Sequence, residues 1–519
     1  MPDVQLTPNK PIVSIIVPMA DDAVDGAQRL ANAQAQTWPH CEIVAVYTEK
    51  TVAPSGAIHL PGGSLAAAIN AGISASKGDH LSLLLPGASY LTEKITKQVE
   101  FIGRFELQDA VVFCNHTILD SKGLPAKAVT LPSVDPLVMF RKLYCGFPLQ
   151  HSSLLFPRQA FDVFGPLNEE TPQSSLHEFC LRLSKHRPFV GMADRLISIA
   201  RRDMGRREKR QWRGLYARML PELLTEQQRG AVNGSLFTTL GEAASSRLAE
   251  GLPMAAWDTV RAMMRALSGS PHRLHALQSF STPLLRGTLR HLPDGVKRLL
   301  RTRVHGQNVL NTARLDFPTI YRENGFVGTE SLSGAGSTLF QTRIIRREVP
   351  LLFRRLGVTS VLDIPCGDFH WMRDVDLAGM HYTGADVVDE IVEINQRRFG
   401  GGTREFKRVD LISGPLPTAD LVFCRDCLVH LPFEDAVSAI DSIRNSRCQW
   451  LLTTTFTRTD PNKDLDDAGW RPLNLTLPPF NFPPPELLIS EKCTEAGGLA
   501  GDKALGLWRI ADLQAHKRT

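Results

Sequence analysis

The sequence has no long hydrophobic run and no cysteine pattern that identifies a class of protein. No apolar stretch in the 519 residues approaches the roughly 20 that a transmembrane helix needs, and the N-terminus has no signal-peptide core. We therefore expect a cytoplasmic protein without a membrane span. Nine cysteines are scattered, and the close pair Cys424 and Cys427 has no second pair or histidine cluster at zinc spacing. Reduced thiols and no metal site are expected.

The sequence also has little excess of one sign of charge over the other. Lysine and arginine number 59 against 54 aspartates and glutamates, a net charge of +5, which is mild for this length and does not indicate nucleic acid as a partner. With 43% hydrophobic and 22% charged residues the composition is that of an ordinary soluble protein, and the length predicts two or three domains.

The pattern along the chain predicts an α/β protein in three parts. Residues 1–203 and 321–519 alternate short β-rich runs with helical segments, the signature of α/β domains. Between them, residues 204–320 are basic and helical in pattern, broken by Gly, Ser and Pro. Two interpretations of this middle region stay open. It is either a solvated helical linker or a surface that contacts anionic lipid or a lipid-linked sugar phosphate, which would place the protein at the inner face of a membrane.

The stretch "VLDIPCGDFHWM" at 361–372 predicts a buried strand that ends in an acid, turns on Gly367 and continues into a helix. A second strand, "HYTGADVV", ends in Asp386, roughly 20 residues on, where a ribose-binding acid stands in dinucleotide sites. The turn nevertheless lacks the G-x-G-x-x-G glycines that let a backbone approach a pyrophosphate. A ligand without phosphates, such as S-adenosylmethionine, needs acids for its ammonium group and ribose instead.

Two further strands complete a resemblance. "FKRVDL" leads to Asp410, and "ADLVFCRDCLVHL" predicts a fourth strand followed by a polar turn. In this order the segments resemble the motifs of class I S-adenosylmethionine-dependent methyltransferases, over residues 320 to 515. The family motif reads "VLDxGCGxG", so Pro365 and Phe369 replace two small residues.

The resemblance implies a seven-stranded Rossmann-like domain that binds S-adenosylmethionine. Gly367 would lie against the cofactor, Asp386 would bind the ribose hydroxyls, and Asp410 with Leu411 would frame the adenine. The implied cofactor-binding residues are Asp363, Pro365, Cys366, Gly367, Asp368, Asp386, Val387, Asp410, Leu411, Cys424 and Arg425.

Later segments agree with this fold. "QWLLTTTF" predicts a fifth strand, and "ELLISEKCTE" with "KALGLWRIADL" predicts a terminal antiparallel hairpin. The prolines of residues 467–486 preclude a regular helix or central strand there, so this segment is either a wall of the acceptor site or a rigid surface loop. The Gly/Ser segment, residues 328–342, either closes over the cofactor or is a capped helix entrance.

Methyl transfer to a hydroxyl requires alignment of the acceptor and removal of its proton. His430, one turn past the fourth strand, is the candidate base, and Asp426 is its rival or its orienting partner. The alternative for His430 is a packed histidine at a helix start.

The N-terminal region resembles family 2 glycosyltransferases of the GT-A fold. The resemblance lies in "PIVSIIVPM", "SLAAAINAGISASKGDHLSLLLPGASYLTEKI" and "HSSLLFPRQAFDVFGPLNEE". The D-x-D metal ligands are replaced by "LLLPGAS", the acids after the second strand are missing, and Ser175 and Leu176 stand where the Glu-Asp base is expected. Glu178 is the nearby acid, with Asp79 and Glu93 as further substitutes. We expect a degenerate transferase that binds a glycan or positions the partner domain.

Together the two resemblances predict a methyltransferase for a sugar hydroxyl in polysaccharide or glycan biosynthesis, with a glycan, nucleotide-sugar or lipid-linked sugar acceptor. The association with a glycosyltransferase-like domain carries the choice of substrate. Two alternatives stay open: a bifunctional enzyme with an active glycosyltransferase domain, and a small-metabolite methyltransferase with an N-terminal interaction module.

Overall fold

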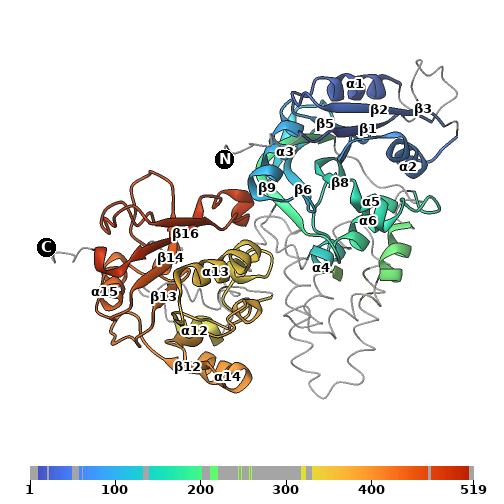
Figure 1. Ribbon diagram of the computed structural model, residues 1–519. Coiled ribbons are helices and arrows are strands. Elements are labelled where there is room, and N and C mark those ends of the chain that lie inside the picture. Colours follow the sequence, from blue (N-terminus) through green and yellow to red (C-terminus); the bar gives the residue numbers. More distant parts are fainter. Residues whose placement is uncertain are drawn as a thin grey trace, which may run out of the picture. The chain divides into compact units, whose positions relative to one another are not determined.

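The computed structural model describes most of residues 10–200 and 330–513 (Figure 1). The described residues are 10–19, 23–48, 58–60, 62–131, 139–172, 174–200, 211–219, 243, 244, 247, 256, 259, 317–322, 326, 330–465 and 469–513. The chain divides into two compact units, Met1–Leu300 and Arg301–Thr519. Among the described residues, no helix is long and apolar enough to cross a membrane.

Most of the predicted basic region 204–320 lies outside the described residues, so its lipid-binding interpretation and the boundaries at 203 and 320 stay predictions. A helix does span 211–219. Its residues Leu215, Tyr216 and Met219 are buried in the hydrophobic core of the N-terminal unit.

The N-terminal unit is built on one mixed sheet with strand order β3-β2-β1-β4-β8-β6-β9-β5, and β7 pairs with β6. Strands β1 to β4 are parallel to one another, whereas β8 runs antiparallel to β4. The strands are β1 Val13–Met19, β2 Cys41–Tyr47, β3 Ile58–His59, β4 His80–Leu83, β5 Ala88–Tyr90, β6 Val111–Leu119, β7 Pro125–Val129, β8 Leu155–Pro157 and β9 Phe189–Ala200. The helices are α1 Ala23–Gln34, α2 Leu65–Ala75, α3 Lys94–Phe105, α4 Met139–Tyr144, η2 His151–Ser153, α5 Gln159–Phe164 and α6 Ser175–Leu183. The predicted GT-A-like α/β class is confirmed by this arrangement.

The C-terminal unit contains a seven-stranded sheet with the order β12-β11-β10-β13-β14-β16-β15. Five strands are parallel, and β16 runs antiparallel to both of its neighbours. The strands are β10 Ser360–Asp363, β11 His381–Asp386, β12 Arg404–Arg408, β13 Leu421–Cys424, β14 Trp450–Phe456, β15 Leu487–Ser490 and β16 Lys503–Arg509. The helices are α12 Phe317–Arg322, η3 Ala335–Ser337, α13 Arg343–Leu356, η4 Met372–Asp374, α14 Asp389–Phe399, η5 Leu428–His430, α15 Phe433–Arg444, η6 Glu495–Gly498 and η7 Ile510–Asp512. The predicted Rossmann-like class and the terminal hairpin β15–β16 are confirmed.

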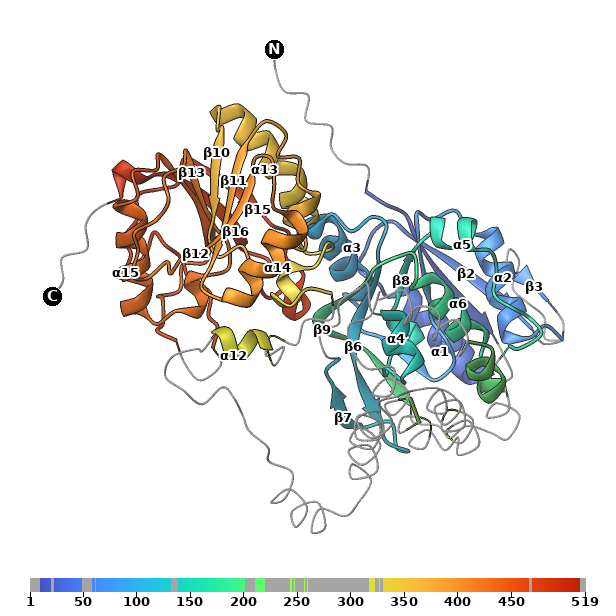
Figure 2. The same cartoon turned by 90° about the horizontal axis from the view of Figure 1, so that it is seen from below.

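Alternate residues of the central strands enter two different cores, because successive side chains of a strand point to opposite faces. Val361 and Phe423 join a core with helix α13, whereas Leu362 and Val422 join a core with α15. The two helices lie on opposite sides of the sheet (Figure 2). Coverage of both faces explains why these strands are apolar runs rather than alternating ones.

The predicted helix directly after β10 is wrong. Residues 364–371 form turns and bends. Between β10 and β11 the helical structure is limited to the short 3-10 helix η4. Phe369 has a φ of 56°, a left-handed conformation that a continuing α-helix does not contain. The turn after β10 therefore lacks the N-terminal dipole of an α-helix. In contrast, the described residues between β14 and β15 contain no helix or strand, as the prolines predicted.

Candidate functional site

The candidate site lies at the carboxyl ends of the parallel strands of the C-terminal unit. Strand β10 has β11 on one side and β13 on the other, so the strand order reverses at β10. Ligands of open α/β sheets bind outside the carboxyl ends of the strands at such a reversal. The polar residues that follow β10, β11 and β13 are those that the sequence predicted.

Asp386 closes the turn after β10 from the end of β11. One carboxylate oxygen accepts from the backbone N–H of Gly367 at 3.1 Å, and the other accepts from that of Val388 at 3.0 Å. Burial raises the pKa of Asp386 to about 6, although these N–H donors oppose the shift. The carboxylate is thus fixed by backbone, with lone pairs left for further donors.

Asp363 and Asp368 flank this turn with different partners. Asp363 is buried and accepts from the hydroxyl of Tyr382, and burial raises its pKa to about 7. Asp368 accepts from the Ser331 hydroxyl at 2.9 Å and from the Leu332 N–H at 2.7 Å. Asp363 therefore supports β11, whereas Asp368 holds the Gly/Ser segment against the turn.

The Gly/Ser segment connects the turn after β10 with the turn after β13. At one end a Cβ on Gly367, whose φ is 53°, would lie 2.3 Å from Ser333 Oγ, so only glycine fits beneath the segment. At the other end Gly336 O accepts from Arg425 at 3.0 Å. Thr342, at the start of α13, makes no side-chain cap, which disfavours the interpretation as a capped helix entrance.

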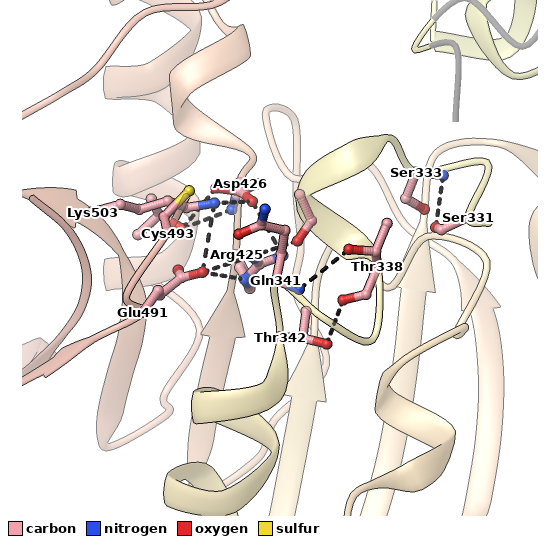
Figure 3. A network of polar contacts seen from close by, with 12 residues as sticks. Ser331, Ser333, Thr338, Gln341, Thr342, Arg425, Asp426, Glu491, Cys493 and Lys503 are labelled. Carbon is pink, nitrogen blue, oxygen red and sulfur yellow. Dashed lines mark hydrogen bonds and ion pairs between the residues drawn. The ribbon is translucent and has the colours of Figure 1, made fainter. Parts of the chain in front are cut away.

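Arg425 belongs to a network of ion pairs (Figure 3). Its guanidinium lies 2.6 Å from Glu491 and 3.1 Å from Asp426. Lys503 contacts the same two carboxylates at 3.6 and 2.6 Å. The side chains of Arg425, Glu491 and Lys503 are at most 5% exposed, so the network joins the turn after β13 to the terminal hairpin.

Asp426 is the most strained member of this network. It has a φ of 54°, and its N–H donates to Thr454 at 2.8 Å. Burial alone would raise the pKa of Asp426, but Arg425 and Lys503 outweigh it and hold that pKa well below its usual range. A carboxylate held so firmly in its ionised form is a poor proton acceptor, which argues against Asp426 as the base.

His430 lies one short helix, η5, beyond Asp426. Its Nδ1 lies 2.7 Å from the Gly469 carbonyl, which can only accept, so Nδ1 carries the proton and Nε2 keeps its lone pair. Burial lowers the pKa of His430 against the opposing effects of this hydrogen bond and of Asp426. The partner that orients the ring is therefore Gly469 of the proline-rich loop, not Asp426.

The remaining predicted residues occupy the rim of the same edge. Asp410 accepts from Ile412 N at 2.9 Å and from the Ser413 hydroxyl at 2.8 Å, and Leu411 is buried. Their neighbours Pro365, Cys366, Val387 and Cys424 all lie at the carboxyl ends of β10, β11 and β13. The cofactor contacts of these residues stay predictions.

Sequence reasoning missed four residues that organise the site: Tyr382, Gly469, Glu491 and Lys503. Tyr382 and Lys503 lie within strands, where a lone polar tip gives no distinctive signal. Glu491 follows β15 and pairs across 66 residues with Arg425. A glutamate and a lysine in a predicted edge hairpin would ordinarily be assigned to solvent, so burial was the missing information.

In the N-terminal unit, the turn that replaces the D-x-D motif is held by backbone contacts. Leu84 O accepts from Arg29 at 3.2 Å, and Leu85 N donates to the Ser152 hydroxyl at 3.1 Å. The three substitute acids do not converge on this turn. Asp79 precedes β4 at the opposite end, Glu93 pairs with Lys97 at 3.1 Å, and Glu178 pairs with Arg182 at 3.1 Å.

No family model matches the chain. An uncharacterized glycosyltransferase of Rickettsia felis is 27% identical over 194 residues, which cover 34% of this chain and 32% of the relative. A second one, from Rickettsia prowazekii, is 29% identical over 175 residues, which cover 31% of this chain and 54% of that relative. The chain therefore matches about a third of the R. felis relative's length and about half of the R. prowazekii one.

The comparison with solved structures finds distant similarity to two kinds of protein. S. aureus TarS 1-349 in complex with UDP-GlcNAc gives a TM-score of 0.34 at 12% identity, covering 58% of this chain and 95% of that one. Magnesium protoporphyrin IX methyltransferase from Synechocystis PCC 6803 with bound SAH gives 0.20 at 18% identity, covering 32% and 68%. Because these scores are low, the fold class rests on the strand orders described above. The chain joins a glycosyltransferase-like unit to a unit with a methyltransferase-like fold.

Proposed function

We propose that the C-terminal unit transfers a methyl group from S-adenosylmethionine to a hydroxyl of a sugar. The observation that carries the proposal is the presence of Asp386 and His430 at the same edge of the sheet, after β11 and β13. Asp386 offers a fixed carboxylate beside the Gly367 turn, and His430 offers a neutral Nε2 whose tautomer is set by Gly469. The first suits a ribose, and the second suits removal of a hydroxyl proton.

The residues of the turn fit this cofactor better than a dinucleotide. Asp368 lies in the turn and Asp386 closes it, while the seven residues 363–369 include no lysine or arginine. Arg425, the nearby cation, is neutralised by Glu491 and Asp426. A diphosphate would be repelled by this acidic turn, whereas a cationic sulfonium with an ammonium group would be attracted.

The residues of the chain would then divide the work. When bound, S-adenosylmethionine supplies a methyl group on a sulfonium, an excellent leaving group. Asp386 binds the ribose hydroxyls, and the Gly/Ser segment, fixed at Asp368 and Arg425, shields the turn from water. His430 Nε2 takes the acceptor's proton, and the ionised Asp426 stabilises the imidazolium that results.

Asp386 gives a prediction for cofactor affinity. In Asp386→Ala we expect S-adenosylmethionine binding to weaken by about 1–3 kcal/mol, because the ribose hydroxyls lose a charged partner. In the wild type, affinity should be constant above neutral pH and fall as the pH drops through about 6, since protonation removes the acceptor. Calorimetric titrations of both proteins and of Asp386→Asn check this. An Asp386→Ala protein that binds as tightly as the wild type would refute the ribose assignment.

The sugar is inferred from the glycosyltransferase-like unit on the same chain. Incubation of the full chain with methyl-labelled S-adenosylmethionine, in the presence of extracted glycan and of a small-metabolite extract, tests the acceptor class. We expect label in the glycan or nucleotide-sugar fraction. Label in the other small metabolites alone would contradict the sugar and favour the small-metabolite alternative.

A further inference from the structure

The N-terminal unit contains a second polar cluster, which methyl transfer does not use. It is formed by α4, η2, α6, the helix 211–219 and residue 247. Its members are Tyr144, His151, His177, Trp212, Tyr216 and Arg247.

Arg247 lies between two tyrosine rings. Its guanidinium carbon is 4.4 Å from the ring centroid of Tyr144 and 4.1 Å from that of Tyr216. The residue is 1% exposed, and no ion pair joins it to a carboxylate of the described residues. The two rings compensate part of its charge by cation–π contact, and its Nη2 donates to the backbone carbonyl of Tyr144 at 3.4 Å. A guanidinium buried without an anion is costly.

Several polar atoms of this cluster have no hydrogen-bond partner among the described residues. They are Arg247 Nε and Nη1, Trp212 Nε1, His151 Nε2 and His177 Nε2. The His177 ring is 4.6 Å from Trp212 and 5.9 Å from His151, centroid to centroid, so these groups belong to one cluster. Native proteins leave few buried polar groups unpaired, and a cluster of them indicates a missing partner.

The charge of Arg247 favours an anion as the partner. Burial lowers the pKa of His177 to about 3 and that of His151 to about 4, so both rings are neutral and Arg247 is the cation of the cluster. The unpaired N–H groups of Arg247 and the indole N–H of Trp212 are donors for the oxygens of a phosphate or carboxylate.

The cluster also adjoins the turn that replaces the D-x-D motif. His151 precedes Ser152, whose hydroxyl accepts from Leu85 N in that turn at 3.1 Å. We propose that Arg247, with Trp212, forms an oxyanion site for a phosphate or carboxylate group of a sugar derivative. In a D-x-D site, carboxylates bind a metal cation that supplies positive charge. Here the guanidinium of Arg247 would supply that charge without a metal.

Titration of the full chain with inorganic phosphate, pyrophosphate, uridine diphosphate and glucuronate, in the presence of a metal chelator, tests the site. We expect at least one of these oxyanions to bind and to raise the melting temperature. A preference for the phosphates would identify a phosphorylated ligand, and a preference for glucuronate an acidic sugar. Arg247→Gln should weaken binding about 10-fold to 100-fold, the loss of charge-assisted hydrogen bonds.

Arg104→Gln is the matched control, because Arg104 is exposed and contacts a single ring, Phe105, at 5.1 Å. It should bind like the wild type. Trp212→Phe keeps the ring but removes the N–H donor, and it decides the question if Arg247→Gln does not fold. Absence of oxyanion binding by the wild type would overturn the proposal. So would binding by Arg247→Gln and Trp212→Phe that is as tight as that of the wild type. No cofactor is used, so this outcome leaves the methyl-transfer proposal untouched.

Discussion

Replacement of His430 by alanine is expected to lower the turnover of methyl transfer by about 10²–10⁴-fold, the usual contribution of a general base. The affinity for S-adenosylmethionine should not change, because His430 acts on the acceptor. The physical basis is the 2.7 Å contact of Nδ1 with Gly469 O, which leaves Nε2 as the proton acceptor. Single-turnover rates with labelled cofactor, together with calorimetric affinities, measure the two effects separately.

His381→Ala is the matched control for this prediction. His381 is exposed at the start of β11, at the end of the sheet opposite to the candidate site. Its removal should leave both turnover and affinity unchanged. If His430→Ala retained near-normal turnover, His430 would be a packed histidine and the base would have to be found elsewhere.

Arg425→Met is expected to lower the free energy of unfolding by about 3–5 kcal/mol, the cost of breaking a buried ion pair on one side. Glu491, whose side chain is 1% exposed, would keep Lys503 at 3.6 Å as its remaining cation, and its Oε1 already has no hydrogen-bond partner among the described residues. Gly336 would also lose its contact at 3.0 Å, so the Gly/Ser segment would loosen. Urea denaturation measures the loss.

Two further variants separate the network from a general charge effect. Arg354→Met removes an arginine whose partner Asp376 is 63% exposed, and it should cost no more than about 1 kcal/mol. The double variant Arg425→Met with Glu491→Gln should recover part of the loss, because no uncompensated carboxylate remains. A cost for Arg425→Met as small as that for Arg354→Met would show that the network does not stabilise the unit.

The central strands of both sheets were predictable because they are short apolar runs bounded by polar or turn residues, whereas β7 and β12 are not apolar. Val361 and Phe423 are buried on one face of their sheet and Leu362 on the other. A short run that is apolar on both faces is stable in a sheet covered by helices on both sides. The order of the acids at the strand ends then predicted which residues lie at one edge. Periodicity could not predict the backbone at Phe369 and Asp426, where a left-handed φ depends on surrounding contacts.

The sequence indicated which polar residues follow the parallel strands, and their roles toward a cofactor stay predictions. Arg425 was predicted to contact the cofactor, which stays a prediction, and in the structure it pairs with Glu491 and Asp426. That pairing joins residues 66 apart, and Lys503 joins Asp426 across 77. Local sequence patterns carry no information on contacts at such separations. The cofactor contacts of Asp363, Asp386 and Asp410 stay predictions until a ligand is bound.

The most direct test of the account is an equilibrium titration of the full chain with S-adenosylmethionine and, separately, with NAD. The acidic turn with Asp368 and Asp386 predicts that S-adenosylmethionine binds at one site, that Asp386→Ala weakens this binding, and that NAD does not bind. Binding of NAD with loss of affinity in Asp386→Ala, or no binding of S-adenosylmethionine by a folded wild-type protein, would contradict the proposal that this unit is a methyltransferase.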